Sequence, residues 1–257
     1  MYIPLIFLLT AFFLGFSISI NLSSRFEMPG ENSGFFLTLA LAFPAGAVVL
    51  GDISYFSSYF SKIYLKNVEN CQSSGIAVGV IASLFISFFL LFLNKKMGKN
   101  GMRIYNGRKA AIEAVFFAVL FSFIFFSFFY VFHVKNGVLY SGASVYSDYS
   151  PHTAMIRSFS KNNNFPTQYP HYGGADVRYH FLFQYFIGVL ERLGMRIDTA
   201  YNLCSALGLS SFLIFLYFLS LKLAKSSAAG VIAIVMFFFR SGCAFFFYLF
   251  RIIEYIG

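Results

Sequence analysis

The chain has 257 residues, of which 58% are hydrophobic and only 11% are charged. Soluble globular domains carry roughly 25% charged residues, so this composition excludes a soluble domain. The net charge of +9 comes from basic residues clustered between apolar runs. Such clusters mark one side of a membrane, and the chain has no basic, aromatic-interleaved module, so we expect no nucleic-acid partner.

In chain order, six apolar runs approach the roughly 20 residues that a helix needs to cross a bilayer. They cover about residues 2–20, 35–50, 76–93, 110–134, 200–221 and 228–250. The first run lacks the basic start and the A-x-A site of a signal peptide, so we interpret it as a transmembrane helix. A seventh run, 179–190, is shorter than the usual minimum of about 17 residues and either dips into the membrane or lies along it. The predicted fold is all-α: a polytopic integral membrane protein with six or seven transmembrane helices and a long outer loop carrying short amphipathic helices.

The basic residues of the loop 94–109 predict the orientation. This loop contains six basic residues: Lys95, Lys96, Lys99, Arg103, Arg108 and Lys109. It contains no acidic residue, and the next one along the chain is Glu113. Cytoplasmic loops are enriched in Lys and Arg, so we expect this loop inside and, by alternation, segment 135–198, segment 52–74 and the N-terminus outside. If run 179–190 does not cross the membrane, Lys222 and Lys225 lie on the cytoplasmic side. If it crosses, Arg192 and Arg196 lie there instead, so two basic residues support each alternative.

The three cysteines, Cys71, Cys204 and Cys243, are odd in number and widely spaced, and they predict neither a disulfide framework nor a zinc site. No repeat and no Pro- or Ser-rich linker divides the chain. The sequence is therefore that of one integral membrane unit.

The outer segment is the candidate functional region, because all four histidines lie between residues 133 and 180. Ordering a long loop costs conformational entropy that a simple connector need not bear, which favours a functional role. The alternative is a solvated loop whose tyrosines form an interfacial belt, since the chain has no Trp.

Within this segment, Ser150 as N-cap and Pro151 as first helical residue predict an amphipathic helix over about 151–160. One side of it carries Ala154, Met155, Ile156 and Phe159. Asp148 and His152 would then lie near each other at its N-terminal end, as candidate catalytic residues. Alternatively, Asp148 only caps the helix and complements its dipole.

The following stretch, 162–180, is rich in Pro and Gly and predicts an irregular, shaped loop. It leads into an apolar helix over about 181–193, with Gly194 as the expected C-cap. The polar residues at the mouth of this helix are candidate substrate-binding residues: His171, Asp176, Arg178 and His180. Arg offers a bidentate fork for phosphate, His a titratable donor and Asp a ligand for a divalent cation. Their spacing matches no strong zinc pattern.

These residues carry a resemblance to a known family. A basic loop and a span are followed by Asp148, the helix 153–160, Asn164-Phe165-Pro166, Tyr169-Pro170, Arg178-Tyr179-His180-Phe181, Leu193-Gly194 and Tyr201-Asn202. This order resembles the first outer loop of GT-C type glycosyltransferases, such as protein mannosyltransferase and lipid A aminoarabinose transferase relatives. The resemblance covers about residues 141–221. It divides the chain into N-terminal spans with the basic loop, 1–109, and a GT-C-like part, 110–257.

The resemblance implies sugar transfer from a polyprenyl-phosphate donor to an acceptor on the outer face of the cell membrane. It implies that Asp148 is the acceptor base or a ligand of a divalent cation, and that Arg178 contacts the lipid phosphate. The chain departs from the family: many members have a second acidic residue where Tyr149 stands, and a Lys-Pro-Pro stretch where 177–180 stands. They also have one span before the basic loop where this chain has three, and more spans after it. We therefore expect the chain to need a further C-terminal portion or a partner subunit for activity.

The alternative function is a non-catalytic membrane subunit or a small transporter, which a charged residue deep inside a span would indicate. His133, Glu113 and Arg240 lie near or within the ends of spans, where snorkelling explains them, and Pro44 would be a simple kink.

Overall fold

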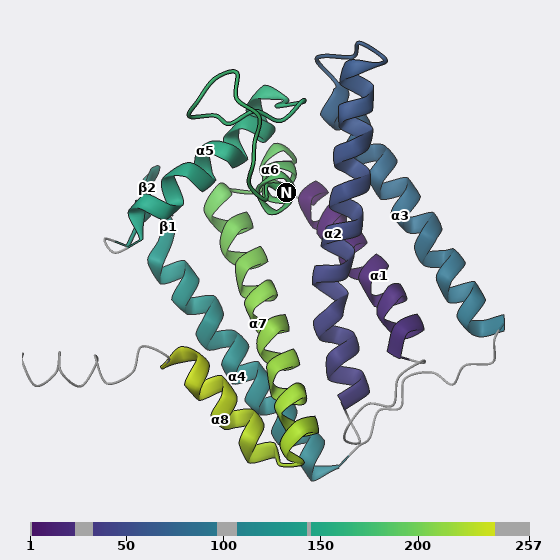
Figure 1. Ribbon diagram of the computed structural model, residues 1–257, viewed down its shortest axis with the longest axis vertical. Coiled ribbons are helices and arrows are strands. Elements are labelled where there is room, and N and C mark those ends of the chain that lie inside the picture. The colour runs from purple at the N-terminus through teal and green to yellow at the C-terminus, as the bar shows by residue number, and fades with distance from the viewer. Residues whose placement is uncertain (1, 24–32, 97–106, 143–144, 240–257) are drawn as a thin grey trace, which may run out of the picture. The chain divides into compact units, whose positions relative to one another are not determined.

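The computed structural model describes residues 2–23, 33–96, 107–142 and 145–239, and these fold almost entirely as helices (Figure 1). The described elements are α1 (Ile3–Ser23), α2 (Ser33–Ile63), α3 (Cys71–Lys96), α4 (Arg108–Val131), β1 (Phe132–Lys135), β2 (Val138–Ser141), α5 (Tyr146–Asn162), α6 (Leu182–Arg192), α7 (Ile197–Ala224) and α8 (Ser227–Phe238). The chain forms two compact units, 1–211 and 212–257, and the boundary falls within α7. This division by packing does not test the boundary expected at 109/110.

Five of the described helices, α1 to α4 and α7, are long and apolar enough to cross a membrane. They correspond to the first five apolar runs of the sequence, so the expectation of a helical membrane protein is confirmed at this level. Of the sixth run, α8 covers the first part with 12 residues, and the remainder lies outside the described residues. Most of the basic loop, 97–106, also lies outside them.

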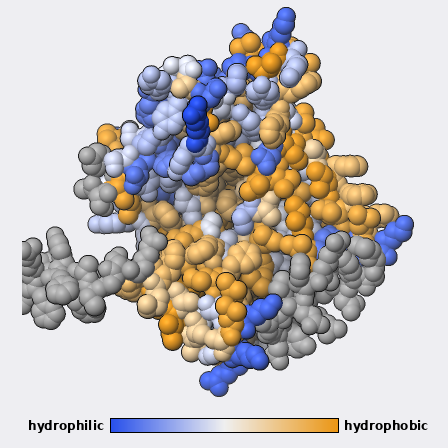
Figure 2. Space-filling model, viewed as in Figure 1, coloured by the Kyte–Doolittle hydropathy of each residue, from blue (hydrophilic) through white to orange (hydrophobic). Residues whose placement is uncertain are grey.

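The flanks of the helices expose apolar side chains, as expected for contact with lipid. In their most apolar windows, only 22% of α3 and 11% of α4 are buried within the protein. Figure 2 shows this apolar surface over α2 and α3, whereas hydrophilic residues gather around α5 and the segment that follows it. The polar segment therefore lies at one end of the apolar helices of the first unit.

Small residues allow α1, α2 and α3 to pack with their backbones in close contact. A Cβ atom on Gly46 of α2 would lie 1.7 Å from the carbonyl oxygen of Ala11, and one on Gly15 of α1 would lie 1.8 Å from that of Ala42. Ala11 and Gly15 are four residues apart, as are Ala42 and Gly46, so each helix presents a small-xxx-small pair at the crossing. A similar crossing joins α3 to α2, where a Cβ on Gly75 would collide with Ser58.

Helix α2 continues well beyond the apolar run that ends at residue 50. Its last turns bring Tyr55 into a buried aromatic cluster with rings from the outer segment, including Phe165 at 5.4 Å, Phe181 at 5.0 Å and Tyr185 at 5.3 Å. The hydroxyls of Tyr55 and Thr167 share a hydrogen bond of 2.7 Å. Tertiary packing against the outer segment thus keeps residues 51–63 helical.

The segment between α4 and α7, which we call the outer segment after its predicted orientation, consists of an antiparallel hairpin, β1 and β2, followed by α5, an irregular stretch and α6 (Figure 1). Helix α6 has 11 residues and is about 16 Å long, roughly half the hydrocarbon thickness. All residues from Gln184 to Leu190 are buried, and Phe186 lies 5.2 Å from the ring of Phe7 in α1. The seventh apolar run is therefore a short helix packed against other helices, too short to cross a bilayer by itself.

In the second unit, the last turns of α7 pack against α8. Gly230 lies beside the ring of Tyr217, and the ring of Phe237 lies 5.3 Å from that of Phe212.

Candidate functional site

Helix α5 carries the two predicted catalytic residues, but it begins earlier than the sequence indicated. The carbonyl of Val145 already accepts hydrogen bonds from the amides of Asp148, at 3.1 Å, and Tyr149, at 3.2 Å. The predicted N-cap Ser150 and first residue Pro151 are therefore wrong, because both lie inside the helix. Pro151 removes only one amide donor near the start of the helix, which the surrounding packing tolerates.

Asp148 lies in the first turn of α5, where the helix dipole stabilises a negative charge. His152 follows four residues later and therefore lies on the same face of the helix. Both side chains line a cavity of about 210 Å³, which we call the α5 cavity. The described residues that line it are Asp148, Pro151, His152, Met155, Tyr169, Tyr179, His180 and Gln184. The structure thus brings the predicted residues Asp148, His152 and His180 together.

Gln184 of α6 orients the imidazole of His152. An amide atom of Gln184 lies 2.8 Å from His152 Nδ1. With Oε1 in that place, Nε2 donates to the carbonyls of His180, at 3.2 Å, and Phe181, at 3.3 Å, and every polar atom of the amide is satisfied. This assignment makes His152 Nδ1 the donor, so the neutral ring keeps the lone pair on Nε2.

The environment of the α5 cavity favours the neutral form of His152. Partial burial lowers the pKa of His152 below its ordinary value, and the nearby His180 lowers it further, whereas Asp148 acts in the opposite direction. The cavity therefore contains a carboxylate next to an imidazole that is neutral near pH 7.

The other predicted substrate-binding residues lie outside this lining, on the exposed loop that leads to it. His171, Asp176 and Arg178 are all exposed. The loop is closed on itself by hydrogen bonds, including one of 3.0 Å from the amide of Tyr169 to the carbonyl of Ala175. Arg178 makes no hydrogen bond or ion pair with the described part of the chain, and it directly precedes the lining residues Tyr179 and His180.

A polar brace fixes α5 against α6 and so sets the geometry of the cavity. Glu191 accepts hydrogen bonds from Arg157 Nε, at 2.7 Å, and from Ser160 Oγ, at 2.6 Å. Next to this brace, a Cβ on Gly188 would lie 2.9 Å from the carbonyl oxygen of Ile156, so glycine permits the close approach. The C-cap of α6 is Leu193, one residue before the predicted Gly194. Gly194 follows the cap with a φ of +105°, and its amide donates to the carbonyl of Glu191.

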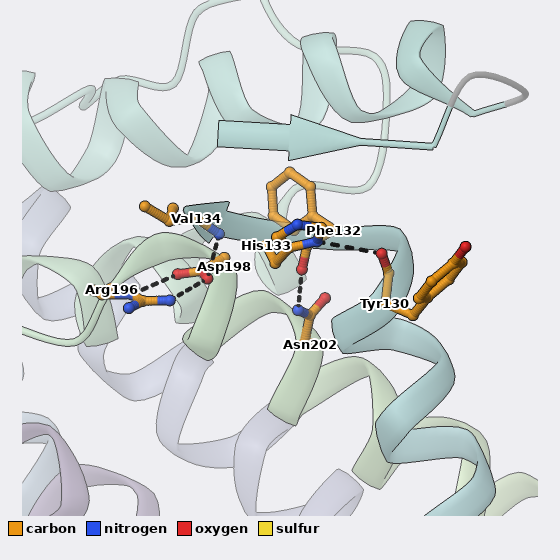
Figure 3. A network of polar contacts seen from close by, with 7 residues as sticks. All are labelled: Tyr130, Phe132, His133, Val134, Arg196, Asp198 and Asn202. Atoms are coloured by element: carbon orange, nitrogen blue, oxygen red, sulfur yellow. Dashed lines mark hydrogen bonds and ion pairs between the residues drawn. The ribbon is translucent and has the colours of Figure 1, made fainter. Parts of the chain in front are cut away.

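The hairpin that precedes α5 is tied to the start of α7 (Figure 3). Asp198 accepts a hydrogen bond of 2.9 Å from the amide of Val134 and pairs with Arg196, while Asn202 Nδ2 donates to the carbonyl of Phe132. His133 belongs to this hairpin, with Nδ1 3.2 Å from the carbonyl oxygen of Tyr130. These contacts connect both ends of the outer segment, from the end of α4 to the start of α7.

Asp148 as a metal ligand stays a prediction. Among the described residues, no group of three or more His, Cys, Asp or Glu side chains is arranged to hold a metal ion. In addition, His152 Nδ1 is already engaged with Gln184. The described side chains thus offer no preformed set of ligands for a divalent cation.

Sequence reasoning missed Gln184 and Tyr169 as members of the cavity. The signal for Gln184 was its place as a single amide in the apolar run Phe181-Leu182-Phe183-Gln184-Tyr185-Phe186. A polar group that is only 2% exposed normally has a hydrogen-bond partner, but the sequence does not show which one. Tyr169 is brought to the cavity by the loop conformation, which has no regular pattern.

Comparison of the chain with protein-family models, with curated proteins and with solved structures gives no match, so the interpretation of the α5 cavity depends on its geometry and on the sequence.

Proposed function

We propose that the protein is a glycosyltransferase of the GT-C type that acts at the outer face of the cell membrane. In this proposal it transfers a sugar from a polyprenyl-phosphate donor to an acceptor hydroxyl. The observation that carries the proposal is the α5 cavity, where Asp148, His152 and His180 meet at the polar end of helices that are long and apolar enough to span a membrane. Such a location suits a substrate whose reactive head is polar and whose tail is apolar.

In the proposed reaction, Asp148 accepts the proton of the acceptor hydroxyl as its oxygen attacks the anomeric carbon. The bond between that carbon and the phosphate oxygen breaks, and the polyprenyl phosphate leaves with the electron pair. A positioned general base contributes roughly 10² to 10⁴-fold to such a step. The lone pair of His152 Nε2 accepts a hydrogen bond from a substrate hydroxyl, because Gln184 holds the proton on Nδ1.

The proposed phosphate end of the site consists of four residues: Arg178, His171, Asp176 and His180. Arg178 is exposed and makes no polar contact with the described residues, so its guanidinium is available for a bidentate contact to phosphate. Its neighbours Tyr179 and His180 line the cavity. We place the donor phosphate at Arg178 because this residue directly precedes two residues of the cavity lining.

The experiment is a transfer assay in native membranes that contain the protein, so that any partner subunit is present. A panel of polyprenyl-phosphate sugars is offered, and release of polyprenyl phosphate is measured. We expect release with at least one donor, and its loss in Asp148→Asn, because the amide keeps the size of the side chain without its negative charge. Arg178→Ala should instead raise the donor concentration needed for half-maximal release.

The matched control is Glu69→Gln, which removes an exposed carboxylate in the connection between α2 and α3, outside the α5 cavity. Its release rate should equal that of the parent. Unchanged release in Asp148→Asn would contradict the proposed base. Absence of release with every donor, together with normal protein levels, would favour the alternative of a non-catalytic subunit.

A further inference from the structure

A second cavity, with a volume of about 450 Å³, is a groove beside the α5 cavity. We call it the asparagine groove; its polar lining includes Lys62, Ser158, Asn162, Asn164, Gln168 and Tyr169. Tyr169 lines both cavities, and Met155 and Ser158, one turn apart on α5, line one cavity each. The groove therefore adjoins the candidate site along α5.

One set of side chains gives the groove its shape. Asn164 Nδ2 donates to Ser158 Oγ, at 2.9 Å, and to the carbonyl of Gln168, at 2.8 Å, while its Oδ1 accepts from the amide of Gln168 at 2.9 Å. Lys62 Nζ donates to the carbonyl of Asn163 at 2.8 Å, which joins the end of α2 to the end of α5. The wall is thus fixed by internal hydrogen bonds.

A second set has unused hydrogen-bonding capacity. The side-chain amides of Asn162 and Gln168 and the hydroxyl of Tyr169 make no hydrogen bond with the described part of the chain, and all three residues are exposed. Each amide offers donors and an acceptor, and Lys62 has two further protons. A groove of this size lies within the range of roughly 300–1,000 Å³ that is typical of small-ligand sites.

We propose that the asparagine groove binds the sugar acceptor, and that this acceptor is a carbohydrate. Neutral amides pair with hydroxyls that both donate and accept, and the Tyr169 ring offers an apolar face to a sugar ring. A groove whose described lining has one cation and several neutral amides is less suited to bind a phosphate or an acidic peptide. This proposal rests on the proposed function and adds its acceptor class: a glycan in the groove would present a hydroxyl to Asp148 past Tyr169.

The test is binding of oligosaccharides, which needs neither donor nor turnover. The parent protein in nanodiscs is applied to an array of neutral and acidic oligosaccharides, with empty nanodiscs as background, and affinities for the retained glycans are then measured. Each lost hydrogen bond contributes about 0.5–1.5 kcal/mol. We therefore expect the double variant Asn162→Ala/Gln168→Ala to bind roughly tenfold more weakly. Tyr169→Ala should weaken binding as well.

The matched control is Asn70→Ala, which removes an exposed side-chain amide outside the groove lining; among the described residues, this side chain has no hydrogen-bond partner. Its glycan affinity should equal that of the parent. Binding that survives in the groove variants, or no retained glycan above background, would overturn the assignment. Capture of peptides in place of glycans in a parallel array would overturn it as well.

These outcomes separate the two proposals. If the groove variants bind glycans more weakly but no membrane preparation releases polyprenyl phosphate, the proposed glycan site is supported and the proposed transferase activity is refuted. Asp148-dependent release with unaltered glycan binding in the groove variants would do the opposite.

Discussion

Replacing Gly46 by alanine should loosen the crossing of α1 and α2, although the change adds a single methyl group. The added Cβ would lie 1.7 Å from the carbonyl oxygen of Ala11, whereas ordinary contacts begin at 3.4 Å. Because the obstacle is backbone, neither helix can relieve the overlap by a side-chain rotation. The two helices must separate by an amount comparable to the overlap, and the well-packed interface around them must open.

Overpacking of this kind costs about 1–3 kcal/mol, and the higher helix propensity of alanine returns up to about 1 kcal/mol. Gly208→Ala in α7 is the matched control, because a Cβ there meets no described atom within 4 Å. It should leave the stability unchanged or raise it slightly. Both variants add the same methyl group to a helix, but only the one at Gly46 meets a neighbouring backbone.

Thermal unfolding in detergent can be followed with a thiol-reactive fluorescent dye, since Cys71 and Cys204 are both fully buried. A Cys243→Ser background removes the third thiol. For a chain of this size, each kcal/mol shifts the midpoint by about 2–4 °C, so Gly46→Ala should melt several degrees below the parent. A midpoint equal to that of Gly208→Ala would refute the close crossing.

Three further predictions concern the outer segment and the topology. The lowered pKa of His152 makes its protonation unfavourable in the folded state, so the parent should lose stability as the pH falls below about 6.5. Melting at pH 7.5 and at pH 5 tests this: the drop in melting temperature between the two should be smaller for His152→Gln than for the parent. Glu191→Ala breaks the brace with Arg157 and should lower the free energy of unfolding by roughly 1–3 kcal/mol, a loss that Glu191→Gln should partly restore. In intact cells, an impermeant thiol reagent should label a cysteine placed at Asn163 and spare one at Gly101; the reverse pattern would contradict the orientation predicted from the basic loop.

The apolar runs predicted the long helices well, because bilayer length and composition alone define them. Helix boundaries that depend on tertiary contacts were harder to predict from the sequence. Helix α2 extends past its apolar run, since Tyr55 is enclosed by rings from residues more than a hundred positions away. The Ser150-Pro151 pair is a good local start signal, yet the helix begins at Tyr146. Local capping preferences of about 1 kcal/mol are easily outweighed by packing.

For the candidate site, helical spacing was enough to place Asp148 and His152 on one face of α5, and the structure places both in one cavity with His180. The partner that sets the tautomer of His152 could not be found in this way. Gln184 lies 32 residues further along the chain, and the approach of its helix depends on Gly188 fitting against Ile156. Contacts of this kind follow from three-dimensional packing, which a pattern in one dimension does not contain.

Helix α6 has a consequence for attempts to isolate the polar segment. One of its edges carries Gln184 toward His152, while Phe186 lies 5.2 Å from Phe7 of α1 and 6.2 Å from Phe43 of α2. An excised fragment spanning the hairpin, α5 and α6 would lose these partners and expose its apolar edge to water. The segment is therefore no autonomous module. A chimera that exchanges it for a foreign sequence would also have to replace the parts of α1 and α2 that contact α6.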